Sequence, residues 1–376
     1  MNAFRLRFWV FLFCTVLSNT VAYASFTLMG THPKASLNWH GAGHPCPANS
    51  NWLADGRAIR NLEAFDGGIY ASYGDWRCNT GPIDLYKMDA LSGAFSYEFT
   101  QATEAISRFR VFDGNLYSVS IDPSGSTNGD VYAVKSNGSW SKKNQVQITG
   151  STALQLTHPL DINTFGGNLW LFSDYWNGTT QSARATRSDD GGSSWYSVLS
   201  LPIVPSDGAR GFCFGEEFNN KLYVQEGRFG CGSITETFSR VYDGISWTTG
   251  PDLAPTGAST RKTGIFAGLM VMIHGQKLYA FDGVSATLTS DAIVHDYVIS
   301  GDTLFVLRNG GKVCRTKNLI SYNCFDDGSA TSLSIAILND HVYLGTELAK
   351  IYRAPIPDWP SIGFLPSVFY LLFGDD

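Results

Sequence analysis

The chain has 376 residues, a formal net charge of −6 and a charged fraction of only 16%, while 39 residues are glycine and 14% are aromatic. This acidic balance argues against general binding to nucleic acids or anionic membranes. Few charges combined with many glycine and aromatic residues are typical of short β-strands joined by tight turns. Long helical patterns are absent from the sequence.

Residues 1–24 have the pattern of a secretory signal peptide. Arg5 and Arg7 precede an apolar run over residues 8–17, and Ala22-Tyr23-Ala24 is a small-x-small cleavage site. An uncleaved membrane anchor is the alternative, but the apolar run is short for a span. The sequence therefore predicts a secreted, extracellular or periplasmic protein of 352 residues (376 − 24), without a membrane span in the mature chain.

Six cysteines remain after Cys14 leaves with the signal peptide, and an oxidising compartment favours disulfides between them. Their spacing does not fix the pairing. Cys314 and Cys324 flank a predicted hairpin, which favours their pairing, and Cys213–Cys231 would join neighbouring strands of one repeat. Cys46–Cys78 would tie the N-terminal segment to the first repeat. A metal site formed by His40, His44 and Cys46 is an alternative use of that segment, although Cys46 is more simply explained as half of a disulfide.

Residues 25–57 contain no clear repeat, and we expect them to pack across the fold or to supply a closing strand. From residue 58 onward a short motif recurs, in which an apolar strand end is followed by Gly, Asn or Asp and then by a Leu-aromatic or Ile-aromatic pair. The copies lie at residues 65–70, 112–117, 165–170 and 218–223, with weaker copies at 299–305 and 338–343. Each copy predicts a tight hairpin turn between two strands.

Repetition of one hairpin at a regular period indicates an array of similar units. We divide the repeats as residues 58–99, 105–148, 157–201, 208–253, 261–290, 293–325 and 331–357. Each repeat is interpreted as four short antiparallel strands, so the prediction is an all-β, seven-bladed β-propeller over residues 58–357. Six or eight blades and a β-sandwich array are the alternatives. Residues 358–376 are predicted to form a tail that packs on the fold or docks a partner.

The stretch Ser188-Asp189-Asp190-Gly191-Gly192-Ser193-Ser194-Trp195 resembles the Asp-box, S-x-D-x-G-x-x-W, at Ser188, Asp190, Gly192 and Trp195. The chain therefore resembles secreted β-propellers of the Asp-box or sialidase-like type. The resemblance implies a turn in which Asp190 bonds local backbone groups, Gly192 takes a strained angle and Trp195 packs between blades. The chain has a single box and lacks a complete sialidase signature, so a sialidase-like activity is less favoured than other chemistries.

Aromatic and charged residues gather where the second strand of several repeats ends. Trp76, Trp176 and Phe229 each lie seven residues after an aligned Ile or Leu, and their polar neighbours are Asp75, Arg77, Asp174, Tyr175, Glu226 and Arg228. A second set precedes or begins the innermost strands and predicts a basic ring at the channel mouth, formed by Arg60, Arg108, His158, Arg210, Arg261 and His295. Aromatic faces suit sugar rings, and a basic ring attracts carboxylate, sulfate or phosphate groups.

These residues predict a propeller that binds or processes an extracellular glycan, with an acidic saccharide favoured by the basic ring. A polysaccharide lyase would draw its base from His158, His295, Tyr73 or Tyr175 and would use Arg210 to neutralise the carboxylate. A glycoside hydrolase would use paired carboxylates from Asp75, Asp174 and Glu226. The alternative is a non-catalytic propeller for protein interaction or surface assembly. No cofactor is predicted, apart from a candidate Ca²⁺ loop at residues 122–130.

Overall fold

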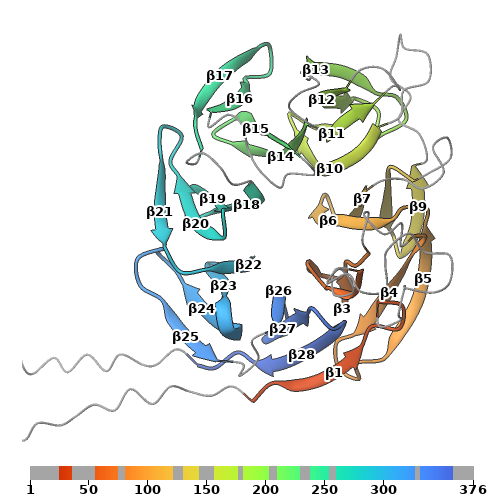
Figure 1. Ribbon diagram of the computed structural model, residues 1–376, viewed down its shortest axis with the longest axis vertical. Coiled ribbons are helices and arrows are strands. Elements are labelled where there is room, and N and C mark those ends of the chain that lie inside the picture. Colours follow the sequence, from red (N-terminus) through yellow and green to blue (C-terminus); the bar gives the residue numbers. More distant parts are fainter. Residues whose placement is uncertain are drawn as a thin grey trace, which may run out of the picture.

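The structure is a computed structural model that describes residues 25–35, 56–74, 81–121, 130–143, 156–176, 181–202, 210–228, 238–253, 260–326 and 331–358. Within these ranges the chain forms seven four-stranded sheets arranged around one axis (Figure 1). The prediction of a seven-bladed β-propeller with four antiparallel strands in each blade is confirmed. Figure 1 shows the blades following one another around the axis in chain order, with the first strand of each blade innermost.

The strand bounds follow the repeats. Blade 1 contains β2 (Leu62–Phe65), β3 (Gly68–Ala71), β4 (Ile83–Asp89) and β5 (Phe95–Gln101), and blade 2 contains β6 (Ala105–Phe112), β7 (Asn115–Ile121), β8 (Tyr132–Ser136) and β9 (Ser139–Lys143). Blade 3 contains β10 (Leu156–Phe165), β11 (Asn168–Trp176), β12 (Gln181–Ser188) and β13 (Tyr196–Pro202), and blade 4 contains β14 (Arg210–Phe218), β15 (Lys221–Arg228), β16 (Phe238–Tyr242) and β17 (Trp247–Asp252). Blade 5 contains β18 (Thr260–Phe266), β19 (Leu269–His274), β20 (Lys277–Phe281) and β21 (Ala286–Ser290). Blade 6 contains β22 (Val294–Ser300), β23 (Thr303–Arg308), β24 (Lys312–Thr316) and β25 (Asn323–Asp326), with a short 3₁₀ turn, η4 (Asn309–Gly311), before β24.

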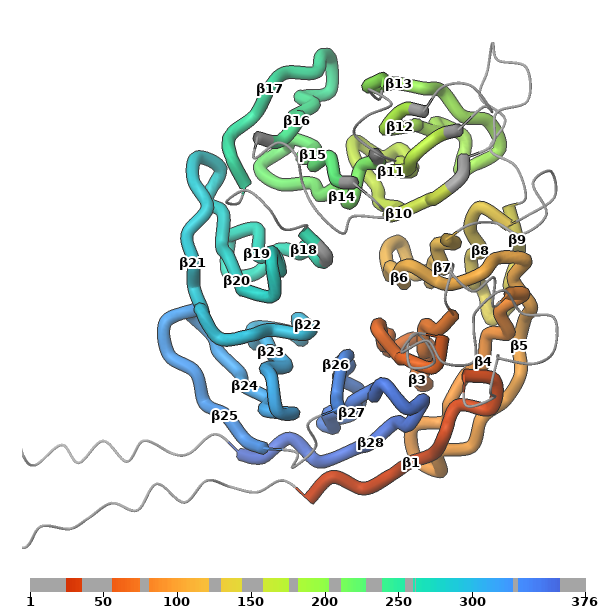
Figure 2. Tube along the Cα trace, viewed as in Figure 1, coloured from red at the N-terminus to blue at the C-terminus, as the bar shows by residue number. Residues whose placement is uncertain are grey.

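Blade 7 is built from both ends of the described chain, which closes the ring. It contains β26 (Ser332–Leu338), β27 (His341–Thr346) and β28 (Lys350–Pro355), and its outermost strand is β1 (Thr27–Thr31). Thr27 pairs with Arg353 and Thr31 with Lys350, so β1 runs antiparallel to β28. Figure 2 shows the red N-terminal strand beside the blue C-terminal one. Part of the 25–57 segment thus supplies a closing strand, while residues 36–55 lie outside the described ranges.

The recurring sequence motif forms the turn between the first and second strands of a blade. Asp66 and Gly67 have φ values of 49° and 69°, and Asp113 and Gly114 have values of 51° and 71°. Positive φ at both central residues defines the tight turn that matches the twist of a hairpin, and Gly, Asn and Asp tolerate it best. The repeated motif is therefore explained by local backbone geometry.

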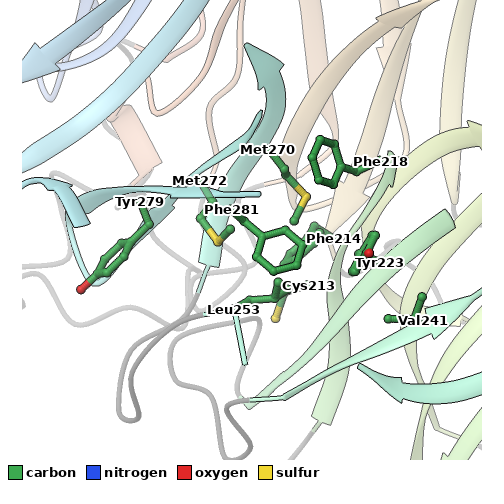
Figure 3. Packing of buried hydrophobic residues seen from close by; sticks show 10 residues of the cluster. All are labelled: Cys213, Phe214, Phe218, Tyr223, Val241, Leu253, Met270, Met272, Tyr279 and Phe281. Carbon is green, nitrogen blue, oxygen red and sulfur yellow. The ribbon is translucent and has the colours of Figure 1, made fainter. Parts of the chain in front are cut away.

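The hydrophobic core lies between neighbouring blades. In the cluster between blades 4 and 5, Phe214 and Phe218 pack with Met270, Met272 and Phe281 (Figure 3). Equivalent clusters join the other neighbouring pairs of blades. The blades thus stabilise one another through shared apolar surfaces, which holds their loops in fixed positions at the two ends of the ring.

The innermost strand of six blades contains a β-bulge at the same place. The register with the second strand shifts by one residue in blades 2 to 7, and the extra residues there are Ser107, Leu160, Cys213, Arg261, His295 and Leu333. A bulge re-aims the side chains that follow it. The residue after each bulge therefore occupies an equivalent position near the axis.

The predicted disulfide Cys314–Cys324 joins the paired strands β24 and β25. Cys213 is also disulfide-bonded, to a cysteine outside the described ranges. Cys46, Cys78 and Cys231 all lie outside those ranges, so the pairs Cys213–Cys231 and Cys46–Cys78 remain predictions.

Candidate functional site

Charged side chains from several blades meet at the axis of the propeller. Arg108 and Arg110 on β6 both bind Asp161 on β10, at 2.8 Å and 2.6 Å between nitrogen and oxygen. Arg110 also reaches Glu216 on β14 at 3.1 Å and donates to the hydroxyl of Thr263 on β18 at 3.2 Å. One guanidinium group thus connects blades 2, 3, 4 and 5, so side chains cross the axis.

Asp161 is the centre of this axial network. Burial pushes its pKa upward, but the guanidinium groups of Arg108 and Arg110 outweigh burial and hold the pKa of Asp161 below its usual range. Its Oδ2 also accepts a hydrogen bond of 3.3 Å from the backbone N–H of Gly215 in blade 4. The carboxylate therefore joins the innermost strands of two blades as well as two cations.

The same kind of link occurs at two other places around the axis. Oδ2 of Asp296 in blade 6 accepts from the N–H of Ile335 in blade 7 at 3.0 Å, and Oδ1 of Asn61 accepts from the N–H of Phe109 in blade 2 at 2.9 Å. Oδ1 of Asp296 also pairs with Lys262 at 2.7 Å. Asp296 lies on an innermost strand and Asn61 directly precedes one, and both side chains hold neighbouring blades in register.

Glu63 is the acidic group of the axis that lacks a direct cation. It is half-buried, and among the described residues it forms no ion pair within 4 Å. Burial raises the pKa of Glu63 to about 7, and Asp296 adds to this effect while Lys262 and Arg110 oppose it. Among the described residues that meet at the axis, four carboxyl groups therefore stand against three cations.

The members of the predicted basic ring do not all lie at the channel mouth. Arg60 is exposed and His295 is half-buried, but Arg108 is buried and belongs to the axial network. His295 and Arg261 are bulge residues, whereas Arg108 follows its bulge, so its side chain points to the axis instead of the mouth. The prediction for Arg108 is corrected accordingly. The side chains of Arg210 and Arg261 lie outside the described part.

Two predicted acid–base residues come together in blade 3. Nδ1 of His158 lies 2.6 Å from Oδ2 of Asp174, and Oδ1 of Asp174 accepts from the backbone N–H of His158 at 2.9 Å. Asp174 is buried and His158 is partly exposed. The guanidinium group of Arg184 stacks 3.8 Å from the ring of Tyr175, and strand alternation puts this stack on the face of the blade opposite to Asp174. Asp174 is thus suited to orient the imidazole ring.

The other candidates are separated from this pair or cannot be placed. The hydroxyl of buried Tyr73 in blade 1 donates to the carbonyl of Asp84 and accepts from its N–H, and burial raises its pKa, so it serves the fold. Glu226 is buried in blade 4. Outside the description lie all of Asp75, Trp76, Arg77 and Phe229, the side chains of Trp176 and Arg228, and residues 122–129 of the candidate Ca²⁺ loop.

Four blades share the same kind of turn between their third and fourth strands. Its sequence pattern is Asp or Asn, any residue, an aliphatic residue, then Ser. In blades 4 and 5, Oδ1 of Asp243 and of Asp282 accepts two backbone N–H groups at 2.8 Å each. Asp89 in blade 1 and Asn318 in blade 6 cap their turns in the same way.

Each of these turns presents its aliphatic side chain to solvent. Leu91, Ile245, Val284 and Ile320 are 76%, 91%, 79% and 86% exposed. We call this set the aliphatic arc, because it lies on blades 4, 5 and 6 and on blade 1 beyond blade 7. In an antiparallel blade these turns lie at the same end as the hairpins between the first and second strands, and we call that end the turn face. In blade 7 the described chain begins and ends at the turn face.

The turn face is acidic. Its turns carry nine exposed aspartates, which are Asp66, Asp89, Asp113, Asp189, Asp190, Asp243, Asp282, Asp302 and Asp340. Backbone N–H groups of the turns lower the pKa of Asp89, Asp243 and Asp282, which keeps these carboxylates ionised. Ionised carboxylates therefore stand two residues before the aliphatic tips of blades 1, 4 and 5, whereas Asp66, Asp189 and Asp302 are paired with Lys87, Arg187 and Lys317.

The turn that resembles an Asp-box joins the third and fourth strands of blade 3, but its aspartate caps N–H groups one residue further along than in the four turns above. Oδ1 of Asp190 accepts from the N–H groups of Ser193 and Ser194, Gly192 has a φ of 91°, and Oγ of Ser188 accepts from the N–H of Gly192 at 2.7 Å. Trp195 is buried between blades 2 and 3. Here glycine occupies the tip, so blade 3 adds no aliphatic side chain to the arc.

Replacing Ser188 by alanine is expected to lower the free energy of unfolding by about 1–2 kcal/mol, since it leaves the buried N–H of Gly192 without its acceptor. Urea unfolding would measure the change. Ser193→Ala, at an exposed position of the same turn, is the control and is expected to change stability by less than about 0.5 kcal/mol. Equal effects of the two substitutions would contradict this role of Ser188.

Within the described ranges, no helix is long and apolar enough to cross a membrane, and no group of three or more His, Cys, Asp or Glu side chains is placed to hold a metal ion.

No family model matches the sequence, and no curated protein matches it. The structure is similar to virginiamycin B lyase from Staphylococcus aureus (TM-score 0.52, 13% identity, 80% of this chain and 95% of that chain). It is also similar to the WD40 domain of Neurospora crassa Pan2 (TM-score 0.50, 11% identity, 89% and 97%) and to BamB from Moraxella catarrhalis (TM-score 0.45, 13% identity, 79% and 85%). At such low identity the similarities to virginiamycin B lyase and to the Pan2 WD40 domain support the β-propeller fold and nothing more.

Proposed function

We propose that the protein is a non-catalytic binding propeller, acting outside the cell, that docks a protein partner through the turn face. The observation that carries the proposal is the aliphatic arc. Four turns in different blades hold an aliphatic side chain in the same position, each 76% to 91% exposed. The Cys314–Cys324 disulfide and the signal-like residues 1–24 support an oxidising, extracellular location.

Isolated exposed aliphatic residues are ordinary on protein surfaces, but a repeated set on one face has a different meaning. The Asp and Asn caps fix each turn, so little conformational freedom is lost when a partner covers the tip. The opposite face and the axis offer less support for catalysis, because Tyr73 and Arg108 are committed to structural contacts. A rigid rim of equivalent tips suits docking to a large surface.

A second candidate function rests on the His158–Asp174 pair at the opposite end of blade 3. The imidazole of His158, oriented by Asp174, has the chemistry to bind or process an acidic glycan. A glycan array followed by an ultraviolet assay for unsaturated uronate products would test it. Turnover that is lost in His158→Ala and retained after changes to the aliphatic arc would replace the docking proposal with this one.

A photo-reactive residue at position 284 tests the docking proposal in the cells that make the protein. We expect one protein partner to be cross-linked from position 284 and none from position 348, where Leu348 is 43% exposed in a turn on the opposite face. The cross-link is expected to disappear when Ile245 and Ile320 are changed to serine. Equal cross-linking from both positions, or cross-linking that survives these substitutions, would contradict the proposal.

A further inference from the structure

The aliphatic arc carries information about the chemistry of its partner. In blades 1, 4 and 5 a carboxylate stands two residues before the aliphatic tip, at Asp89, Asp243 and Asp282. Its Oδ1 is bonded to backbone N–H groups of the turn, so the charge is held beside the apolar side chain. In three of the four turns of the arc, an anionic group therefore stands at a fixed position beside the apolar tip.

We propose that the partner presents a cationic amphipathic protein surface, in which Lys or Arg side chains surround the apolar groups that cover the arc. This inference rests on the proposed docking function and goes beyond it by naming the partner's chemistry. Lys and Arg combine a charged end with an apolar stem, so they can cover an aliphatic tip and reach its neighbouring carboxylate. Complementary charge also speeds encounter and excludes wrong partners.

Other occupants fit the rim less well. A membrane surface would receive the aliphatic tips, but the ionised aspartates beside them would have to approach the headgroups, and anionic lipids would repel them. A second copy of the chain would bring one acidic face against another, with nine exposed aspartates on each side. Because like charges at an interface are unfavourable, the charge pattern favours a cationic protein over both.

The chain itself provides a matched substitution for testing the charges. Asn318 caps its turn in blade 6 by the same two hydrogen bonds that Asp243 and Asp282 make, at 3.0 Å each. Asp243→Asn and Asp282→Asn therefore remove the charge but keep a side-chain oxygen that can accept the same two hydrogen bonds, as Asn318 does in blade 6. Asp113→Asn, in a first hairpin turn of blade 2 outside the arc, is the control for loss of one exposed charge.

The probe is a synthetic amphipathic helix of leucine and lysine, compared with its leucine–glutamate twin and with vesicles of phosphatidylcholine. We expect the full-length protein to bind the lysine peptide and neither of the other two probes. Binding should be roughly tenfold weaker at 1 M salt than at 0.05 M salt, because salt screens the charges. Asp243→Asn with Asp282→Asn should weaken binding to a similar extent, whereas Asp113→Asn should have little effect.

The outcomes separate the two proposals. If serine at 245, 284 and 320 abolishes binding while the asparagine variants bind normally, the partner's charge is wrong and the docking surface stands. If neither set changes binding to the lysine peptide, both proposals fail. Binding of phosphatidylcholine vesicles through the same three positions would replace the protein partner with a lipid surface, and absence of any binding to the lysine peptide would overturn the inference about charge.

Discussion

Replacing Asp161 by leucine is expected to lower the free energy of unfolding by about 3–5 kcal/mol, the largest effect we expect of any single substitution discussed for this protein. The carboxylate is fully buried and binds Arg108, Arg110 and the N–H of Gly215. Its removal leaves two guanidinium groups in the axis with one carboxylate, Glu216, close to Arg110. Unfolding in urea, followed by tryptophan fluorescence, would measure the loss.

Two further variants serve as comparisons for Asp161→Leu. Asp161→Asn retains an acceptor for the N–H of Gly215 but removes the charge, so its stability should fall between those of the wild type and the leucine variant. Asp302→Asn breaks an ion pair with Lys317 in which both side chains are more than half exposed, and it should change stability little. If the leucine variant lost less than about 1 kcal/mol, the axial network could not be a main support of the ring.

Glu63→Gln is expected to stabilise the protein at alkaline pH and to leave it unchanged at acid pH. The pKa of Glu63 is raised from 4.5 to about 7 by burial, so the folded state binds the extra proton in this window. Stability is therefore lost as the pH rises from about 4.5 to 7, and the full cost is present above 7. The difference corresponds to about 3 kcal/mol as an upper value, since part of the side chain meets solvent.

The measurement is the difference in unfolding free energy between wild type and Glu63→Gln at several pH values. Groups that titrate in both proteins cancel in this difference. Glu217→Gln, at an exposed position of blade 4, is the control and should give a flat line. A difference for Glu63→Gln that does not change between pH 4.5 and 8 would show that its carboxyl group is solvated in the axis.

The turns between first and second strands explain why so much of the ring could be predicted from sequence. Asp66-Gly67 and Asp113-Gly114 need positive φ, which few residues tolerate, so the requirement is written into the sequence at each repeat. Blades 2, 3 and 4 lie within a few residues of their predicted repeats, because the hairpin motif marks each of them. The closing role of β1 was one of two options, because strand pairing between distant segments leaves no local signal.

The axial network could not be predicted from the sequence. A bulge shifts the orientation of each following side chain by one position, and no particular residue type marks the bulge. Its position near the start of an innermost strand predicts Arg108 at the channel mouth, but the bulge at Ser107 turns the side chain to the axis. The aliphatic arc did have a readable signal. The four-residue pattern occurs at 89–92, 243–246, 282–285 and 318–321, and a search for repeated turns with an aliphatic tip would have found it.

The most direct test of the docking function is the affinity of the partner that is cross-linked from position 284. The dissociation constant should be measured for the wild type, for the protein with serine at 245, 284 and 320, and for Leu348→Ser. Burial of three aliphatic side chains predicts at least about 100-fold weaker binding of the triple variant, while Leu348→Ser should bind as the wild type does. A triple variant that is folded and binds within about twofold of the wild type, a difference of less than 0.5 kcal/mol, would contradict docking through the aliphatic arc.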